Sequence, residues 1–185
     1  MGSRRRMRPI KARIFVGCEG KCEIAFITWL QKICDAEGRS IYLDKAEAGG
    51  GDTLAIVQEC LQLQSRGWRQ RGAYVRSLVI LDRDRVAGDG ERGRRAVATA
   101  ERAGFLLVFS KPNMEGLLLR LFPTHEQDDP PAGRTFDELR RSWPDYRKPP
   151  ITAELERRFS VDDLRRAARF DEDLAALLRA IGILR

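Results

Sequence analysis

The sequence predicts an α/β fold, built on a mostly parallel four-stranded sheet with helices on its faces and a helical C-terminal extension. Four short apolar runs typical of strands alternate with helical patterns, and this alternation implies crossover connections between parallel strands. The run at residues 78–81 (LVIL) is apolar without interruption, as expected for a strand that is covered on both faces. With 185 residues, of which 43% are apolar, the chain is long enough for one domain with a hydrophobic core.

The first part of the chain predicts two strand–helix units. Residues 13–18 form an apolar run, after which isoleucine and leucine recur at helical spacing until the next glycine. Residues 40–43 predict a second strand. A run of three glycines then leads to Asp52, which is a favourable N-cap residue for a helix that begins at Thr53 and ends at Gly72.

The rest of the chain predicts two further units and the extension. The third strand, residues 78–81, leads directly into Asp-Arg-Asp, and a charged, Gly-rich loop is expected over residues 86–94. Residues 105–109 predict the fourth strand, which an apolar helix follows. From Glu126 onward, Pro-rich and acidic stretches separate four predicted helices. They lie near residues 136–143, 153–159, 161–168 and 171–181.

Charge is distributed unevenly along the chain. The formal charge of +7 comes from 34 Lys and Arg against 27 Asp and Glu, and it favours an acidic partner such as nucleic acid. Six basic residues and no acidic residue precede Ile14, so the remainder is nearly neutral. We therefore expect a basic tail at residues 1–12, an α/β core at residues 13–125 and a helical extension at residues 126–185 that packs on the core.

Membrane, secretion and zinc signals are not indicated by the sequence. No apolar stretch approaches the roughly 20 residues of a membrane helix, and no apolar signal-peptide core follows the first arginines. The four cysteines contain no C-x2-C pair and accompany a single histidine, unlike a zinc set or a disulfide framework. We expect a cytoplasmic protein with reduced thiols and no membrane partner.

Acidic residues follow three of the four predicted strands: Glu19 and Glu23 follow the first, Asp82 and Asp84 the third, and Glu115 the fourth. Ligands of open α/β sheets bind at the carboxyl ends of strands, so we expect five carboxylates at one edge. In extended chain, Asp82 and Asp84 would point to the same side. Such a cluster is unfavourable without cations, and its oxygens suit Mg²⁺ or Mn²⁺. Each acid alone is more typical of a solvated loop or of a first helical turn than of a metal site, whereas the joint arrangement favours a metal site.

Three motifs carry a family resemblance. VGCEGKCE at residues 16–23, ILDRD at residues 80–84 and SKPNME at residues 110–115 resemble the signature blocks of the Toprim (topoisomerase–primase) domain. The version is similar to that of RloB-like proteins and of the nuclease part of OLD-family proteins, and WPDYRK at residues 143–148 resembles the RloB C-terminal pattern. The likeness spans about residues 13–169, with all acidic positions intact. Departures from the family pattern stand at Cys22, Lys111, Met114 and Leu117.

The resemblance implies a Toprim-like fold and a nuclease that hydrolyses phosphodiester bonds of DNA or RNA with Mg²⁺ or Mn²⁺, and it leads us to expect two ions. Glu19 would act as ligand or as general base, and Lys148 would stabilise charge on the scissile phosphate. RloB-like proteins also imply, by analogy, a role in bacterial antiphage defence with an ATPase partner. The metal ligands would be Glu19, Glu23, Asp82, Asp84, Ser110 and Glu115, and the catalytic set Glu19, Asp82, Asp84 and Lys148.

Several basic and aromatic residues are candidates for contact with nucleic acid. The arginines could follow a phosphate backbone or form a solvated helix face, whereas Tyr146 and Trp143 could stack on bases, with core packing the stronger expectation for Trp143. Two other functions stay open: a non-catalytic nucleic-acid-binding module that partners an ATPase, and a receiver-like domain with Asp82 as phosphoacceptor. The candidate contacts are Arg83, Arg85, Arg92, Arg94, Arg95 and Tyr146.

Overall fold

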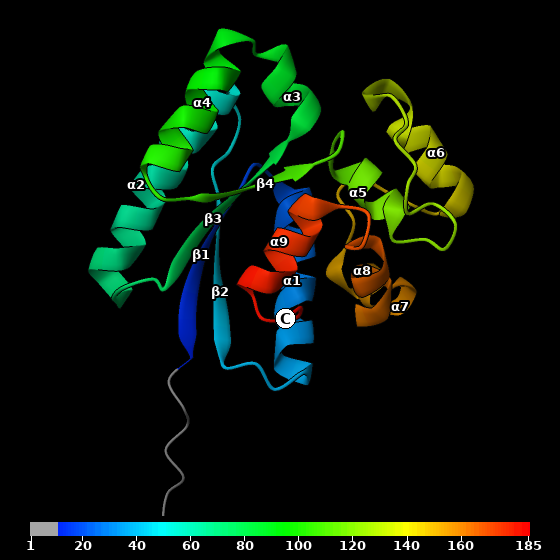
Figure 1. Cartoon of the computed structure of the whole chain (residues 1–185), viewed down its shortest axis with the longest axis horizontal. Coiled ribbons are helices and arrows are strands. Elements are labelled where there is room, and N and C mark those ends of the chain that lie inside the picture. Colours follow the sequence, from blue (N-terminus) through cyan, green and yellow to red (C-terminus); the bar gives the residue numbers. More distant parts are fainter. Residues whose placement is uncertain (1–10) are drawn as a thin grey trace, which may run out of the picture.

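The computed structural model describes residues 11–185, so the first ten residues of the predicted basic tail lie outside the described residues. All four strands are parallel and form one sheet in the order β2-β1-β3-β4 (Figure 1). The predicted α/β fold on a parallel four-stranded sheet is confirmed, with a second strand longer than expected. The strands are β1 (Ala12–Cys18), β2 (Ile41–Glu47), β3 (Arg76–Asp82) and β4 (Leu106–Ser110).

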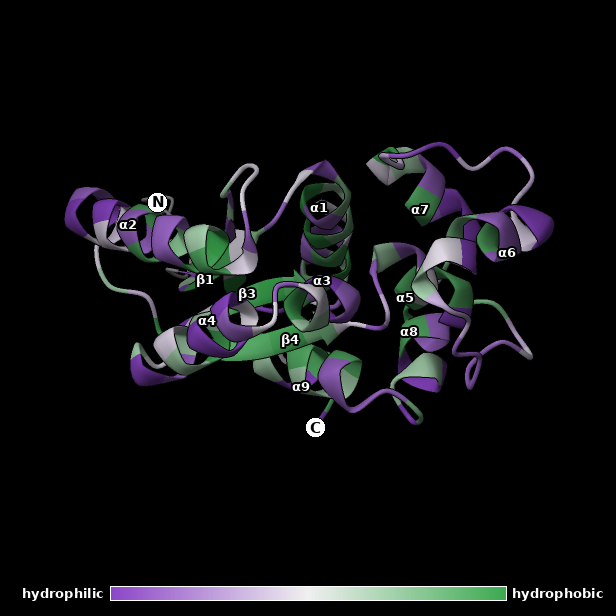
Figure 2. Cartoon of the chain, turned by 90° about the horizontal axis from the view of Figure 1, so that it is seen from above, coloured by the Kyte–Doolittle hydropathy of each residue, from purple (hydrophilic) through white to green (hydrophobic). Residues whose placement is uncertain are grey.

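Helices cover both faces of the sheet (Figures 1 and 2). Helices α1 and α9 share a hydrophobic cluster with one face, and α2 and α4 share a second cluster with the other face. Within residues 11–185, no helix has both the length and the apolar character needed to cross a membrane. The covering helices are α1 (Lys21–Ala36), α2 (Thr53–Arg71), α4 (Glu91–Arg102) and α9 (Glu172–Ala180).

The central strand β3 contributes side chains to both layers, because successive residues of a strand point to opposite faces. Leu78 and Ile80 pack in the cluster with α1, whereas Val79 and Leu81 pack in the cluster with α2 and α4. All four side chains are almost fully buried. This division explains why the run at residues 78–81 contains no polar residue.

Helix α2 begins and ends where the sequence predicts. The Asp52 carboxylate accepts a hydrogen bond from the Ala55 N–H (3.0 Å) and so caps the helix. At the other end Gly72 has a φ of 88°, a backbone conformation that favours glycine. Local cap chemistry is therefore sufficient to locate this helix.

The loop predicted over residues 86–94 is wrong. Helix α3 (Arg83–Gly88) begins directly after β3, and only two residues separate its end from the start of α4. Gly90, with a φ of 54°, makes the turn between the two helices, and the Asp89 carboxylate accepts a hydrogen bond from the Thr53 N–H (2.6 Å). The glycines therefore mark one tight corner held against α2, and not a long flexible segment.

The C-terminal part forms a helical lobe beside the carboxyl edge of the sheet (Figure 2). Its aromatic side chains join those of α1: the Phe159 ring lies 6.1 Å from Trp29 and 6.0 Å from Trp143, measured between ring centroids. Lobe and sheet thus share one hydrophobic cluster. The elements of the lobe are α5 (Met114–Arg120), η1 (Ala132–Arg134), α6 (Thr135–Ser142), α7 (Thr152–Arg158) and α8 (Val161–Ala167).

The last helix, α9, leaves the lobe and returns to the sheet beside β4. The Asp173 carboxylate accepts a hydrogen bond from the Phe109 N–H (3.2 Å), and Leu174 and Leu177 are buried in the same cluster as β3. The helical extension is therefore packed on the core, and its final helix completes one face of the α/β layer itself.

The start of α8 carries a capping box that gives a pH-dependent stability prediction. The Ser160 hydroxyl accepts from the Asp163 N–H (3.3 Å), and the Asp163 carboxylate accepts from the Ser160 N–H (2.8 Å). Partial burial raises the pKa of Asp163, but the hydrogen bonds from Ser160 and the ion pair with Arg166 outweigh it and lower the pKa.

Asp163→Ala is expected to lower the free energy of unfolding at pH 7 by about 1 to 2 kcal/mol. Because the folded-state pKa of Asp163 is lowered, its stabilisation is present above the unfolded-state pKa and is lost as pH falls through the folded-state value. Urea unfolding from pH 7 to pH 3 should thus show the gap between wild type and variant narrowing in acid. The neighbouring, largely exposed Asp162→Ala is the control, and an equal loss there would contradict the capping role.

Candidate functional site

The strand order creates a switch point between β1 and β3. The chain passes from β1 to β2 on one side and then crosses to β3 on the other side of β1, so the connections leave a crevice at the carboxyl ends of these strands. Glu19 directly follows β1, Asp82 ends β3 and Ser110 ends β4, where the register pairs it with Asp82. Three sequence-predicted residues therefore lie at the same edge of the sheet.

The acids after β1 are held by neighbouring groups. One carboxylate oxygen of Glu19 forms an ion pair with Arg85, while the other, Oε2, is buried without a hydrogen-bond partner in residues 11–185. Glu23 is buried in the first turn of α1, and its Oε2 accepts a hydrogen bond from the Gly20 N–H (2.9 Å). Burial raises the pKa of Glu23 despite this bond. Both acids are thus turned inward and not into solvent.

Asp82 and Asp84 do not lie on one extended segment. Since α3 begins immediately after Asp82, Asp84 lies in the first turn of a helix, and the expectation that strand alternation aligns the two side chains is wrong. The Asp84 N–H donates to the Pro112 carbonyl (3.0 Å), and the Asn113 side chain donates a long hydrogen bond to Asp84 (3.4 Å). These contacts attach Asp84 to the loop that follows β4.

Asp82 is the electrostatic centre of the cluster. Burial, followed by the charges of Glu23, Asp84 and Glu115, raises the pKa of this carboxyl to about 8, against the opposing charge of Lys148. Its Oδ1 is buried without a hydrogen-bond partner in the described chain. A coupling of this kind requires the acids to lie close together, so four of the five predicted carboxylates act on one another.

Glu115 is the most buried of the five acids, with an exposed fraction of 2%. Its Oε1 accepts a hydrogen bond from the Tyr146 hydroxyl (3.1 Å) and forms an ion pair with Lys148 (2.9 Å). Lys148 therefore lies at the site, as predicted. The expected stacking role of Tyr146 is corrected: its ring is buried and packs against Trp143, with ring centroids 5.1 Å apart, so it has no free face for a base.

Asn113 of the third motif and Gly116, which directly follows the motif, have roles that the sequence analysis did not assign. Asn113 is the N-cap of α5, and its side chain accepts a hydrogen bond from the Gly116 N–H (3.2 Å). A Cβ added to Gly116 would lie 2.4 Å from the Lys111 carbonyl oxygen, so only glycine fits there. Cap and glycine together fix the turn that directs Glu115, and the N-cap pattern was the sequence signal for it.

Ion pairs with distant residues also fix this turn. Arg120 is buried, pairs with Asp171 (2.9 Å) and donates to the Lys111 carbonyl (2.5 Å). The Lys111 ammonium in turn pairs with Asp173 (2.5 Å). The acidic partners lie more than fifty residues further along the chain, at the start of α9, so no local sequence pattern identifies these contacts.

The arginines expected to contact nucleic acid have different surroundings. Arg85 points to Glu19 and to the Gly51 carbonyl, and the Arg83 guanidinium lies 4.9 Å from the centre of the Phe109 ring. Arg92 pairs with Asp52 (2.8 Å) and Arg94 with Glu91 (2.6 Å). Arg95 is exposed and makes no ion pair within residues 11–185. Their contact with nucleic acid therefore stays a prediction.

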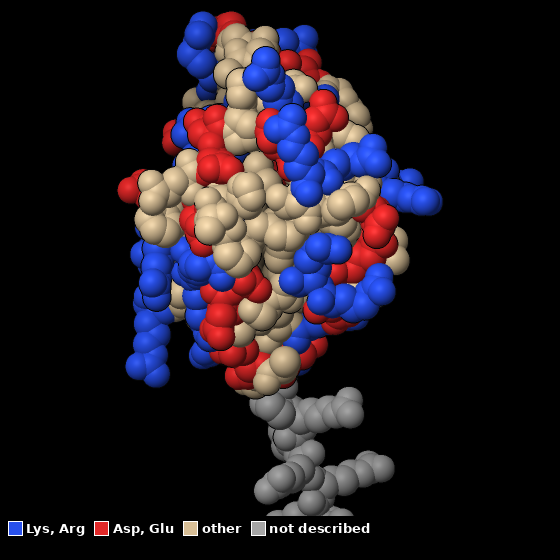
Figure 3. Space-filling model, turned by 90° about the vertical axis from the view of Figure 1, so that its right-hand side faces the viewer, with Lys and Arg blue, Asp and Glu red and all other residues tan. Residues whose placement is uncertain are grey.

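The charge on the lobe surface is mixed. Figure 3 shows the face on the right-hand side of Figure 1, where basic and acidic side chains are interspersed around an area without charged residues. This face carries no uniform positive field, in keeping with the nearly neutral charge of the chain after its tail.

The residues of the cluster fit a hard divalent cation in their chemistry. Three buried side-chain oxygens have no hydrogen-bond partner in the described chain: Glu19 Oε2, Asp82 Oδ1 and Ser110 Oγ. They belong to the ends of β1, β3 and β4, and oxygen ligands are those that Mg²⁺ and Mn²⁺ prefer. As the side chains stand, no group of three or more His, Cys, Asp or Glu within residues 11–185 is arranged to hold an ion. Arg85 and Lys148 supply the compensating positive charge.

Comparisons of the chain with protein-family models, with curated proteins and with solved structures gave no match.

Proposed function

We propose that this chain is a Toprim-like, metal-dependent nuclease that hydrolyses phosphodiester bonds of DNA or RNA. One observation carries the proposal: acids follow β1, β3 and β4 at the carboxyl edge of the sheet, and within residues 11–185 one buried side-chain oxygen at each of these three strand ends has no hydrogen-bond partner. Unpaired buried carboxylate and hydroxyl oxygens cost free energy, so their retention requires a compensating use. Binding of a cation provides that use.

Glu19, Asp82 and Ser110 would hold the cation through their unpartnered oxygens, and Glu23, Asp84 and Glu115 would add negative charge around it or hold a second ion. When bound, Mg²⁺ or Mn²⁺ supplies a Lewis acid that polarises the phosphate and lowers the pKa of water. The ion would have to compete with Arg85 and Lys148 for the acids that these side chains now pair with. Departure of Arg85 from Glu19 would also free a base for the attacking water.

The chain's own basic groups would then act on the phosphate. Lys148, once released from Glu115, is placed to stabilise negative charge that develops on the scissile phosphate. Tyr146 is a positioning residue, because its hydroxyl holds the Glu115 carboxylate from the buried side. The nucleophile in this proposal is water, and the proton that it loses would pass to Glu19.

A non-catalytic nucleic-acid-binding module is the alternative of a different class. It would gain nothing from buried, mutually repelling carboxylates at the place where phosphates must bind. The five acids therefore favour catalysis over binding alone. The antiphage role, the ATPase partner and the cytoplasmic location rest on sequence inference and analogy, without further support from the site.

Cleavage assays test the proposed function. The protein is incubated with single-stranded DNA, double-stranded DNA and RNA in Mn²⁺, Mg²⁺ or EDTA, beside Glu19→Ala and the double variant Asp82→Ala/Asp84→Ala. We expect cleavage of at least one substrate that needs the cation and is lost in both variants. Metal-independent binding of nucleic acid without cleavage, unchanged in the variants, would contradict the nuclease and support the non-catalytic binding module.

A further inference from the structure

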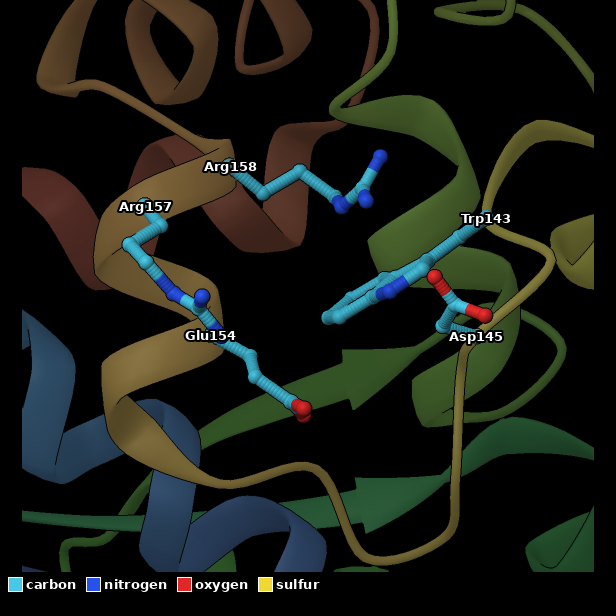
Figure 4. A pocket seen from close by; sticks show the side chains of 5 residues that line it. All are labelled: Trp143, Asp145, Glu154, Arg157 and Arg158. Carbon is cyan, nitrogen blue, oxygen red and sulfur yellow. The ribbon is translucent and has the colours of Figure 1, made fainter.

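A second hollow lies between α7 and the segment that precedes Lys148. It has a volume of about 440 Å³, in the range of small-ligand sites, and its lining combines an indole with two basic and two acidic side chains. Figure 4 shows these side chains converging from the two walls of the pocket. The lining residues are Trp143, Asp145, Glu154, Arg157 and Arg158.

The polar groups of this pocket are available to a ligand. Within residues 11–185 neither its carboxylates nor its guanidinium groups form an ion pair, although the two kinds of charge line the same space. Trp143 has an exposed fraction of only 2%, and its indole N–H forms no hydrogen bond within residues 11–185; since this N–H is not one of the buried groups without a partner, it stays open to the pocket. Arg158 lies over one face of that ring, 4.7 Å from its centroid. The pocket therefore offers hydrogen-bond donors and acceptors side by side.

The pocket and the carboxylate site share one segment of chain. Trp143 and Asp145 line the pocket, whereas Tyr146 and Lys148 contact Glu115. The Trp143 ring packs on Tyr146, whose hydroxyl bonds to Glu115, so two side-chain contacts separate the pocket wall from this proposed metal ligand. The pocket and the carboxylate site are therefore connected through residues 143–148, which contribute side chains to both.

We propose that this pocket is a nucleotide subsite that takes a guanine nucleotide of the substrate beside the bond cleaved. Guanine has adjacent acceptors, O6 and N7, which suit an arginine, and it has N–H donors on its other edge, which suit a carboxylate. No other base combines an adjacent acceptor pair with an adjacent donor pair. Arg158 or the Trp143 N–H would bond to the acceptors, and Asp145 or Glu154 to the donors. The subsite rests on the proposed nuclease function, because that function makes its ligand part of a substrate.

Calorimetric titration of the whole chain in EDTA with the monophosphates GMP, AMP, CMP and UMP tests the subsite without any cleavage. We expect GMP to bind about tenfold more tightly than the others, as one bidentate base contact allows. Asp145→Asn/Glu154→Gln should remove this preference, and Trp143→Phe, which keeps an aromatic ring but lacks the N–H, should weaken it. Asp137→Asn, which removes an exposed acid on α6 outside the pocket, is the matched control and should bind GMP as wild type does.

The outcomes separate the subsite from the proposed function. Equal binding of all four monophosphates and of inorganic phosphate would reduce the pocket to an anion site and overturn the proposal, as would no binding at millimolar concentration. Selective GMP binding without cleavage of any nucleic acid would support the guanine site and overturn the nuclease. Where cleavage occurs, mapped cuts should cluster beside guanine in wild type and lose that bias in Asp145→Asn/Glu154→Gln.

Discussion

Asp82→Asn is expected to lower the rate of phosphodiester cleavage by about 10³-fold, the scale at which a single electrostatic group supports a transition state. Asp82 lies at the centre of the acid cluster, and its Oδ1 is one of the three buried oxygens without a partner. Asparagine keeps the shape but removes the negative charge that would hold the cation. The rate is measured under single-turnover conditions in Mn²⁺, with Asp137→Asn as a control for the loss of one exposed acid.

The same variant should not destabilise the metal-free protein. Burial and neighbouring acids raise the pKa of Asp82 to about 8, so the charged form of this carboxyl group destabilises the folded, metal-free wild type. Asparagine removes that cost, and its side-chain N–H groups can donate to the neighbouring acids. We expect the Tm of Asp82→Asn in EDTA to equal or exceed that of wild type. A lower Tm together with lost activity would indicate a structural role for Asp82 in place of the proposed one.

Lys148→Met is expected to lower kcat by about 10²-fold, because it removes the positive charge proposed to act on the scissile phosphate. Partial burial lowers the pKa of Lys148, but its contact with Glu115 outweighs this and raises the pKa, so the side chain stays charged at neutral pH. Affinity for Mn²⁺ should be retained or increased, since Lys148 competes with the cation for Glu115. Single-turnover rates and Mn²⁺ titrations measure the two effects separately.

Lys148→Arg is the matched variant for this prediction. It keeps the charge but changes the shape of the cationic group, and we expect partial recovery of kcat. If Lys148→Met and Lys148→Arg both cleave at the wild-type rate, Lys148 is only the partner of a buried acid. If Lys148→Met also loses Mn²⁺ binding, the assignment of Asp82 to the cation and of Lys148 to the scissile phosphate is wrong.

The features predictable from the sequence are those that local chemistry controls. The β3 run at residues 78–81 indicates a strand buried on both faces, and Asp52 and Gly72 delimit α2 through cap chemistry. The positions of Glu19 and Asp82 after their strands then follow from the rule that parallel strands end at the same edge. Each of these inferences needs only neighbours within one or two turns of chain.

The features that were missed depend on contacts between distant segments. Arg85 pairs with Glu19 across the switch point, and Tyr146 turns inward because Glu115 accepts its hydroxyl proton in a hydrogen bond. The glycines at residues 88 and 90 predicted a loop. The structure instead has a tight corner between α3 and α4, where the Asp89 carboxylate accepts a hydrogen bond from the Thr53 N–H at the start of α2. Tertiary packing determines the conformation of these segments, and neither residue spacing nor helix propensity in the sequence predicts that packing.

Binding of Mn²⁺ is the measurement that tests the central claim most directly. In the metal-free protein, titration followed by electron paramagnetic resonance should show saturable binding of Mn²⁺ to wild type, and Asp82→Asn and Ser110→Ala should weaken it. Asp137→Asn should bind as wild type does. The absence of saturable binding to wild type, or equal binding by Asp82→Asn, would contradict the assignment of the strand-end cluster as a cation site.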